Sequence, residues 1–241
     1  MLVFGRNSVR EALNSGTQIE KIFVQDDIRG EENQQIVEKI KQSNYPYSFL
    51  PKKVMDKKSG GEKHQGFIAD VAEFKYSTVD EIVNGAVESG EQVFLCILDG
   101  ISDPHNLGSI IRSCECAGVQ GIIMEKRNCC DINATVMKVS AGAINYVKVA
   151  KVTNLAQTIE GLKKRGIWVY SIELGGGCIY KANLKGDIAV VIGSEGFGTR
   201  RLVKEKCDDV LSLPMKGKVN SLNASNACAI ALFEILRQRM N

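Results

Sequence analysis

The stretch VFLCILDGISDPHNLGSIIR, residues 93–112, decides how the second half of this 241-residue chain is expected to fold. Val93–Leu98 is a short, wholly apolar run, which is typical of a strand buried on both faces. Pro104–Ala117 then has helical spacing, and Ser102 or Asp103 before a proline is a helix-start signal. A buried strand that leads directly into a helix predicts one repeating unit of a parallel sheet covered by helices.

The same alternation of strand and helix patterns continues toward the C-terminus. Short β-branched runs predict further strands at Gly121–Met124, Lys148–Val152, Ile167–Ile172, Ile188–Ile192 and Val210–Leu213. Amphipathic or small-residue stretches predict helices at Asn133–Val147, Leu155–Lys164, Arg200–Lys206 and Leu222–Arg239. This order predicts an α/β domain over residues 91–241, with a parallel sheet covered on both faces.

The first 75 residues follow a different, more compact pattern. Helical spacing is found at Ser8–Leu13 and Gln34–Lys41, and extended patterns at Ile19–Val24, Tyr47–Leu50 and Phe67–Val71. Residues 1–75 are therefore expected to form a small α/β domain of their own. Residues 76–90 are expected to be a short helix or a linker between the two domains.

The composition supports folded domains and excludes several classes of protein. Hydrophobic residues make up 44% of the chain, which disordered proteins lack. The longest uncharged run, residues 219–233, is shorter than the roughly 20 apolar residues of a membrane span. No apolar leader stands at the N-terminus, and 8 cysteines fit a reducing compartment, so a cytoplasmic location is expected. A net charge of +3 does not by itself indicate nucleic-acid binding.

The cysteine spacing gives no reason to expect a metal site. Cys114-Glu-Cys116 and Cys129-Cys130 are not the C-x2-C pairs of zinc sites, and the chain has only 2 histidines. We interpret the cysteines as small, buried apolar residues.

A lysine cluster lies between two expected elements of the first domain. It comprises Lys52, Lys53, Lys57 and Lys58. Two interpretations are open: a solvated helix face, or a surface that contacts the phosphates of a nucleic acid, since lysines release the counterions of its backbone.

Three loops at strand ends carry more polar residues than a connection needs, and ligands of parallel sheets bind at such ends. The first loop brings Asn106, Gly108 and Arg112 onto or near one helical face. The second, residues 193–198, is rich in glycine but matches neither the dinucleotide fingerprint nor the Walker loop. The third crowds polar side chains at a helix start, of which capping explains only one: Ser221, Asn223, Ser225 and Asn226.

Together these loops resemble the three motifs of the SpoU (TrmH-like) branch of the SPOUT methyltransferases. The family patterns are D-P-x-N-x-G-x-x-x-R, [IVM]-G-x-E-G-x-G and [IL]-P-M-x-G-x-x-x-S-L-N-x-S. They match residues 103–112, 192–198 and 213–225, in order. Asn226 stands where a small or apolar residue is more common. Within this branch the chain is most similar to the bacterial guanosine 2′-O-methyltransferases of 23S ribosomal RNA.

The resemblance implies a C-terminal domain with a deep trefoil knot, a homodimer, an RNA substrate and S-adenosylmethionine as cofactor. The cofactor is expected to be held by backbone around Gly193, Leu213 and Leu222, with Gly196 and Met215 nearby. Arg112 is the implied catalytic residue, with further residues around it: Asn106, Glu195, Ser221 and Asn223.

Alternatives remain open for the role of Arg112 and for the substrate. An arginine with a pKa above about 12 is an awkward base, so Arg112 either gives up its proton or stays charged and clamps the adjoining phosphate. The substrate alternatives are transfer RNA in place of ribosomal RNA, and a non-catalytic RNA-binding protein that kept the fold.

Overall fold

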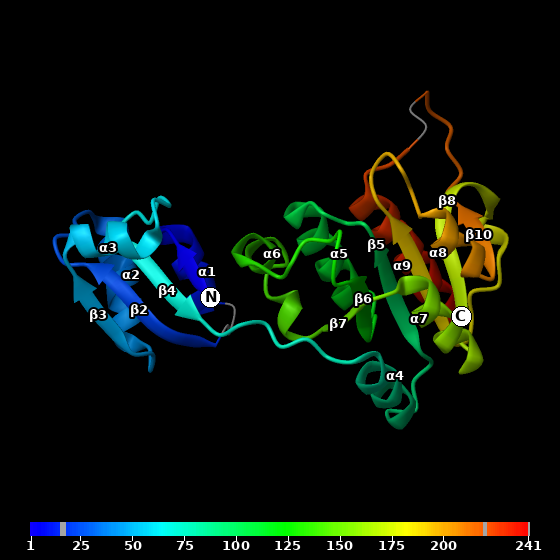
Figure 1. The fold of residues 1–241 in the computed structure, drawn as a ribbon, viewed down its shortest axis with the longest axis horizontal. Coiled ribbons are helices and arrows are strands. Elements are labelled where there is room, and N and C mark those ends of the chain that lie inside the picture. The colour runs from blue at the N-terminus through cyan, green and yellow to red at the C-terminus, as the bar shows by residue number, and fades with distance from the viewer. Residues whose placement is uncertain (15–17, 219–220, 241) are drawn as a thin grey trace. The chain divides into compact units, whose positions relative to one another are not determined.

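The computed structural model describes residues 1–14, 18–218 and 221–240 (Figure 1). The chain divides into two compact units, Met1–Lys75 and Tyr76–Asn241.

The first unit is a four-stranded sheet in the order β1-β4-β2-β3. Strands β1 and β2 pair with β4 antiparallel, whereas β2 and β3 are parallel. Ile22, Met55 and Phe67 are among the apolar residues of this unit that are fully buried. The elements are β1 (Leu2–Phe4), α1 (Arg6–Asn14), β2 (Ile19–Gln25), α2 (Glu31–Gln42), β3 (Tyr47–Leu50), α3 (Lys52–Ser59) and β4 (Phe67–Val71).

The second unit is built on a six-stranded, wholly parallel sheet in the order β10-β8-β9-β5-β6-β7. Its strands are β5 (Phe94–Asp99), β6 (Gly121–Glu125), β7 (Lys148–Val152), β8 (Trp168–Cys178), β9 (Ile188–Gly193) and β10 (Asp209–Ser212). Its helices are α4 (Val79–Glu88), α5 (Pro104–Cys116), α6 (Ala134–Val139), α7 (Leu155–Lys164), α8 (Arg201–Lys206) and α9 (Ala224–Arg239). Every residue of the central strand β5 is buried, which confirms the expected α/β fold class.

Residues 76–90 are grouped with the second unit, and most of them form the helix α4. Thr78 and Glu81 form a capping box that starts α4. The helix buries Ile82 and Val83 in the core of the second unit. Gly121 on β6 leaves the space that Ile82 fills, because a Cβ there would overlap the isoleucine side chain.

Two predicted elements differ in extent from the structure. The helix expected over Asn133–Val147 is divided into α6 and a 3-10 turn, Ala143–Asn145, because Ala141 and Gly142 adopt positive φ angles of 50° and 88°. Strand β8 runs beyond the expected apolar stretch as far as Cys178, where it pairs with β10 across an irregularity in register. Apolar periodicity does not detect this extension, since it contains three consecutive glycines.

After the edge strand β10 the chain returns across the sheet. Helix α9 contacts β8 and β9 and packs against α5, so it lies beside the centre of the sheet (Figure 1). The knotted topology implied by the resemblance requires a return of this kind. Within the described residues, no helix has the length and apolar character needed to cross a membrane.

Candidate active site

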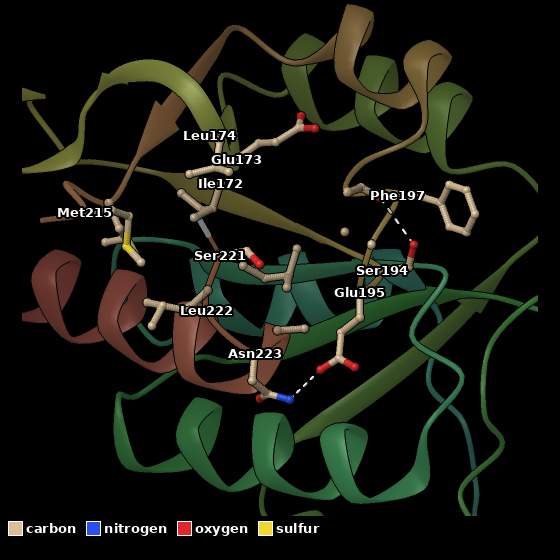
Figure 2. A pocket seen from close by; sticks show the side chains of 17 residues that line it. Ile172, Glu173, Leu174, Ser194, Glu195, Phe197, Met215, Ser221, Leu222 and Asn223 are labelled. Carbon is tan, nitrogen blue, oxygen red and sulfur yellow. Dashed lines mark hydrogen bonds between the residues drawn. The ribbon is translucent and has the colours of Figure 1, made fainter. Parts of the chain in front are cut away.

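A cavity of about 580 Å³ lies at the carboxyl ends of β8 and β9, next to the first turn of α9 (Figure 2). This is the edge where parallel sheets bind ligands, and the volume is in the range of small-molecule sites. Residues from four stretches of the chain line it: Ile172, Glu173, Leu174, Ile192, Gly193, Ser194, Glu195, Gly196, Phe197, Gly198, Leu213, Met215, Ser221, Leu222, Asn223, Ala224 and Ala227.

The loop after β9 is a tight turn that projects Glu195 toward α9. The backbone N–H groups of Ser194 and Gly198 each donate to the other residue's carbonyl, at 3.1 and 2.9 Å. Gly193 allows this closure, since a Cβ there would overlap the backbone of Gly198. Gly196 has a φ of +85°, which an L side chain rarely adopts. Phe197 is 91% exposed at the rim of the cavity.

A network of amide and carboxylate groups joins the three polar loops. The Asn106 Nδ2 donates to Glu195 Oε1 at 3.1 Å, and Asn223 Nδ2 donates to Asn106 Oδ1 at 2.9 Å. Asn223 Nδ2 also donates to Glu195 Oε1, a contact drawn in Figure 2. The Asn223 Oδ1 meanwhile accepts from the backbone N–H of Ser225 at 3.0 Å and so caps α9. One asparagine therefore starts a helix and orients the carboxylate of another loop.

The lining of the cavity combines apolar surface with two carboxylates. Ile172, Leu213 and Met215 are among its apolar side chains. Glu195 stands on one side, and Glu173 on another, where its Oε2 lies 3.1 Å from Lys204 Nζ. Such a lining suits a ligand that is partly apolar, and Glu195 can meet a positive charge on it, since the charge of Glu173 is already paired with Lys204.

An ion-pair group that joins the buried Asp99 to the exposed Arg200 was not anticipated from the sequence. Asp99, 1% exposed at the end of β5, accepts from the Arg200 backbone N–H at 2.7 Å and from Arg200 Nε at 2.6 Å. Arg200 also pairs with Glu125 at 2.8 Å. Hydrogen bonds from Arg200 to Glu125 and Asp99 raise the arginine pKa above its ordinary value. This group ties the end of the Glu195 loop to β5 and β6. A lone Asp at the end of a predicted strand was its only sequence signal.

The structure brings most of the predicted site residues together. Eight of them line the cavity: Gly193, Glu195, Gly196, Leu213, Met215, Ser221, Leu222 and Asn223. Asn106, 8% exposed, joins them through the hydrogen-bond network. Ile172, Glu173 and Phe197 line the same cavity and had not been singled out, because nothing in an apolar strand end or a glycine loop distinguishes them from ordinary structure.

The prediction that Asn106, Gly108 and Arg112 share one helical face is wrong. Asn106 is buried toward Glu195, Gly108 is buried against Val139 of α6, and Arg112 is exposed. Six helical positions separate Asn106 from Arg112, which places the arginine about 9 Å further along the axis and about 120° around it. Arg112 does not line the cavity.

The lysine cluster is on α3 of the first unit. Lys52, Lys53 and Lys57 are exposed, whereas Lys58 is half-buried with its Nζ 4.2 Å from the centre of the Phe23 ring. Three of the four lysines are thus available to a partner.

Fold and site define a two-unit α/β protein whose larger, parallel-sheet unit binds a small ligand at its carboxyl edge. Residues 93–233 match the model of the SpoU rRNA methylase family, and residues 2–77 match the model for RNA 2′-O ribose methyltransferase substrate binding. The chain belongs to the SpoU rRNA methylase family, the TrmH/SpoU RNA 2′-O-ribose methyltransferases.

Relatives and solved structures are similar along almost the whole chain. A TrmH-family tRNA/rRNA methyltransferase of Bacillus subtilis (strain 168) is 42% identical over 98% of this chain and 95% of its own. One of Staphylococcus aureus (strain COL) is 41% identical over 99% and 96%. The SpoU methyltransferase AviRb of Streptomyces viridochromogenes, in complex with AdoMet, has a TM-score of 0.76 at 22% identity, covering 100% of this chain and 91% of its own.

Proposed function

We propose that this protein transfers a methyl group from S-adenosylmethionine to the ribose 2′-oxygen of a guanosine in 23S ribosomal RNA. The observation that carries the proposal is the cavity at the ends of β8 and β9, closed on one side by the Glu195–Asn106–Asn223 network. The family match to an rRNA methylase supports ribosomal RNA as the substrate.

The residues of the cavity fit the proposed cofactor. Its apolar side chains, including Leu213 and Leu222, suit the adenine ring and the methionine chain. The carboxylate of Glu195 complements a positively charged ligand, whereas the charge of Glu173 is already paired with Lys204. The relatives AviRb and the Sinorhizobium meliloti rRNA methyltransferase have been solved with AdoMet bound. The cofactor supplies an electrophilic methyl group, so the protein has only to position and deprotonate the ribose hydroxyl.

We assign the network residues to orientation of the substrate. Glu195 lines the cavity, and its carboxylate is held by Asn106 and Asn223. Ser221 lies on the wall next to Asn223 and offers a hydroxyl to the same space. Arg112 acts on the 2′-hydroxyl, either as its base or as a charged clamp on the neighbouring phosphate.

The position of Arg112 favours an active site shared between two copies of the chain. Arg112 is exposed and lies on a different face of α5 from Asn106. On α9, which packs against α5, Ile230 and Phe233 are 39% and 47% exposed. Association through this apolar surface would form a homodimer in which Arg112 of one copy serves the cavity of the other.

Mixing two inactive variants tests the shared site. An Arg112→Ala chain and a Glu195→Ala chain are unfolded, mixed and refolded together. A shared site predicts that about half of the dimers are heterodimers with one intact site, so activity returns. If Arg112 instead serves the cavity of its own chain, every site in the mixture carries one of the two substitutions, and the mixture stays inactive.

The substrate is tested by mapping 2′-O-methyl groups in total RNA from cells with and without the gene. Loss of one guanosine methylation in 23S ribosomal RNA is the expected result. Loss of a methyl group in transfer RNA would instead favour the tRNA alternative, which the tRNA/rRNA names of the relatives leave open. No change in any RNA, with purified protein also inactive, would favour the non-catalytic alternative.

A further inference from the structure

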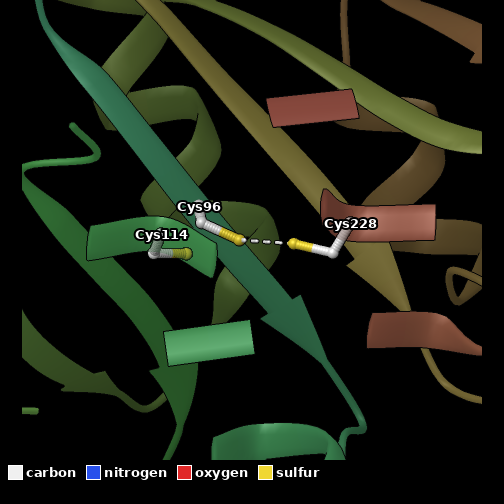
Figure 3. A group of neighbouring side chains, drawn as sticks. All are labelled: Cys96, Cys114 and Cys228. Carbon is white, nitrogen blue, oxygen red and sulfur yellow. Dashed lines mark hydrogen bonds between the residues drawn. The ribbon is translucent and has the colours of Figure 1, made fainter. Parts of the chain in front are cut away.

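Three cysteine thiols meet in the core of the second unit, apart from the cavity (Figure 3). Cys96 lies on β5, Cys114 on α5 and Cys228 on α9, and each is fully buried. The Sγ atoms of Cys96 and Cys228 are 3.8 Å apart, and the three sulfurs lie within 4.8 Å of one another. None of the three takes part in the proposed methyl transfer.

The spacing of the sulfurs is that of a three-coordinate site. A bond of about 2.3 Å from each thiolate sulfur to a central ion places the three sulfurs about 4.0 Å from one another in a planar site, and about 3.4 Å from one another in the pyramidal site of an ion that carries a lone pair. Small side-chain rotations therefore suffice to bring all three sulfurs onto one ion. The cluster could not be predicted from the sequence, because its three cysteines lie on different elements. Cys96 and Cys228 alone are separated by 132 positions.

The surroundings of the thiols carry no charge. The pKa of Cys96 is raised by hydrogen bonding with Cys114 and Cys228 and by burial, and no charged side chain of the described residues contributes. No charged side chain of the described residues affects the pKa of Cys114 or Cys228 either. Burial raises the pKa of Cys114, and hydrogen bonds from Cys114 and Cys96 lower the pKa of Cys228.

Because the surroundings are uncharged, the net charge of the ion together with its three thiolates decides which sulfur-preferring ion the site favours. Three thiolates around copper(I) carry a net charge of −2, and three around zinc carry −1 and leave the fourth position of a tetrahedral ion empty. Three thiolates around a trivalent ion are neutral. Burial of net charge without a partner is costly, so the neutral complex is favoured.

We propose that Cys96, Cys114 and Cys228 form a binding site for a trivalent thiophilic ion of the arsenic(III) class. Arsenous acid, As(OH)₃, enters by ligand exchange: three As–S bonds form, three As–O bonds break, and the three thiol protons leave with the hydroxides as water. No atom changes oxidation state, so no oxidant or reductant is required. The bound ion would tie β5, α5 and α9 together.

The site is expected to bind slowly and to stabilise the fold. Because the thiols are fully buried, entry requires local opening of α9 or α5. In the unfolded chain, the same three thiols must first close a long loop, which costs entropy. An ion that prefers the folded chain raises its melting temperature.

The test uses full-length protein in which the other five cysteines, Cys116, Cys129, Cys130, Cys178 and Cys207, are replaced by serine. The reduced protein is incubated with arsenite without oxygen and then desalted. The expected result is one arsenic per chain, three sulfur neighbours by X-ray absorption, and a higher melting temperature. No retained arsenic, or arsenic with both sulfur and oxygen neighbours, would overturn the proposal.

Two controls separate the site from general thiol chemistry. Cys228→Ser in the five-serine background is expected to lower arsenic retention at least tenfold, and Cys228→Ala repeats the test without a buried hydroxyl. Unchanged retention in a folded variant of either kind would overturn the three-thiol assignment. Zn²⁺ is offered under the same conditions, and its retention in preference to arsenite would overturn the charge argument. None of these measurements depends on methyl transfer.

Discussion

Glu195 is the residue through which the three polar loops of the site are joined. Glu195→Ala removes the acceptor of Asn106 Nδ2, a buried donor. An unpaired buried donor costs about 1–3 kcal/mol, so we expect this variant to lose stability in that range by urea unfolding. Glu195→Gln keeps an oxygen that accepts the same bond and should lose much less. Equal stability of the two variants would show that the hydrogen bond does not support the fold.

Arg112 is the residue whose two candidate roles can be separated by substitution. Because it does not line the cavity, Arg112→Ala should abolish methyl transfer and leave cofactor affinity within a few-fold. Arg112→Lys should retain partial activity if a charged clamp suffices, although the bidentate fork is lost. If Arg112 is the base, a lysine in its place deprotonates more easily, with a pKa of about 10.4. The rate of the lysine variant should then begin to rise with pH at a lower pH than the rate of the wild type does.

The control for both substitutions is Arg201→Ala, which removes an exposed arginine paired with Glu205 on its own helix. It should leave the rate unchanged. Wild-type activity in Arg112→Ala would contradict the catalytic assignment altogether.

At the scale of elements, the turn between β9 and α8 depends on its glycines, of which Gly193 has the closest backbone neighbours. Gly193→Ala places a Cβ against the backbone of Gly198 and Thr199, which has no side-chain freedom with which to yield. We expect a loss of at least about 2 kcal/mol in unfolding free energy and weaker cofactor binding by calorimetry. Gly161→Ala on α7 is the matched control, since nothing lies near its Cβ, and it should gain about 0.5–1 kcal/mol. Equal effects would mean that the turn tolerates a side chain.

Helix α3 carries the lysine cluster, and contact with RNA phosphates is one of its two interpretations. Replacing Lys52, Lys53, Lys57 and Lys58 by alanine should weaken RNA binding and lower the salt dependence by about 0.7–0.9 in log–log slope per lost contact. Lys58 should contribute least, because it already covers the Phe23 ring. A double Lys39→Ala, Lys41→Ala change on α2 serves as the control. An unchanged slope would leave the cluster as a solvated helix face.

Local signals in the sequence predicted elements well where one physical cause dominates. Helix α5 begins as expected at Asp103 and Pro104, because capping and proline geometry depend on neighbouring residues alone. Strand β1 was missed because three residues are too few to show a period. The division of the helix over Asn133–Val147 was missed because Ala141, a residue that favours helix, adopts a positive φ there.

At the scale of the whole molecule, the site could be predicted only as a set of residues. Motif resemblance named Glu195, Asn106 and Asn223, but their hydrogen bonds depend on the return of the chain from β10 to α5. No local pattern encodes that return. The three-thiol cluster and the Asp99–Arg200 pair were missed for the same reason, since both join residues about a hundred or more positions apart.

The boundary between the two units yields a prediction about which fragment can work alone. Residues 76–241 contain α4, whose Ile82, Val83 and Ala86 complete the core of the second unit. This fragment should fold and bind S-adenosylmethionine with the affinity of the full chain, because every residue that lines the cavity lies within it.

A fragment that starts at residue 90 lacks α4 and exposes the surface around Gly121. Losing two large buried side chains should cost it more than about 3 kcal/mol and lower its melting temperature markedly. Calorimetric titration and thermal unfolding of both fragments check this. Equal melting temperatures would show that α4 is dispensable, and a folded 76–241 fragment without affinity would show that the first unit takes part in cofactor binding.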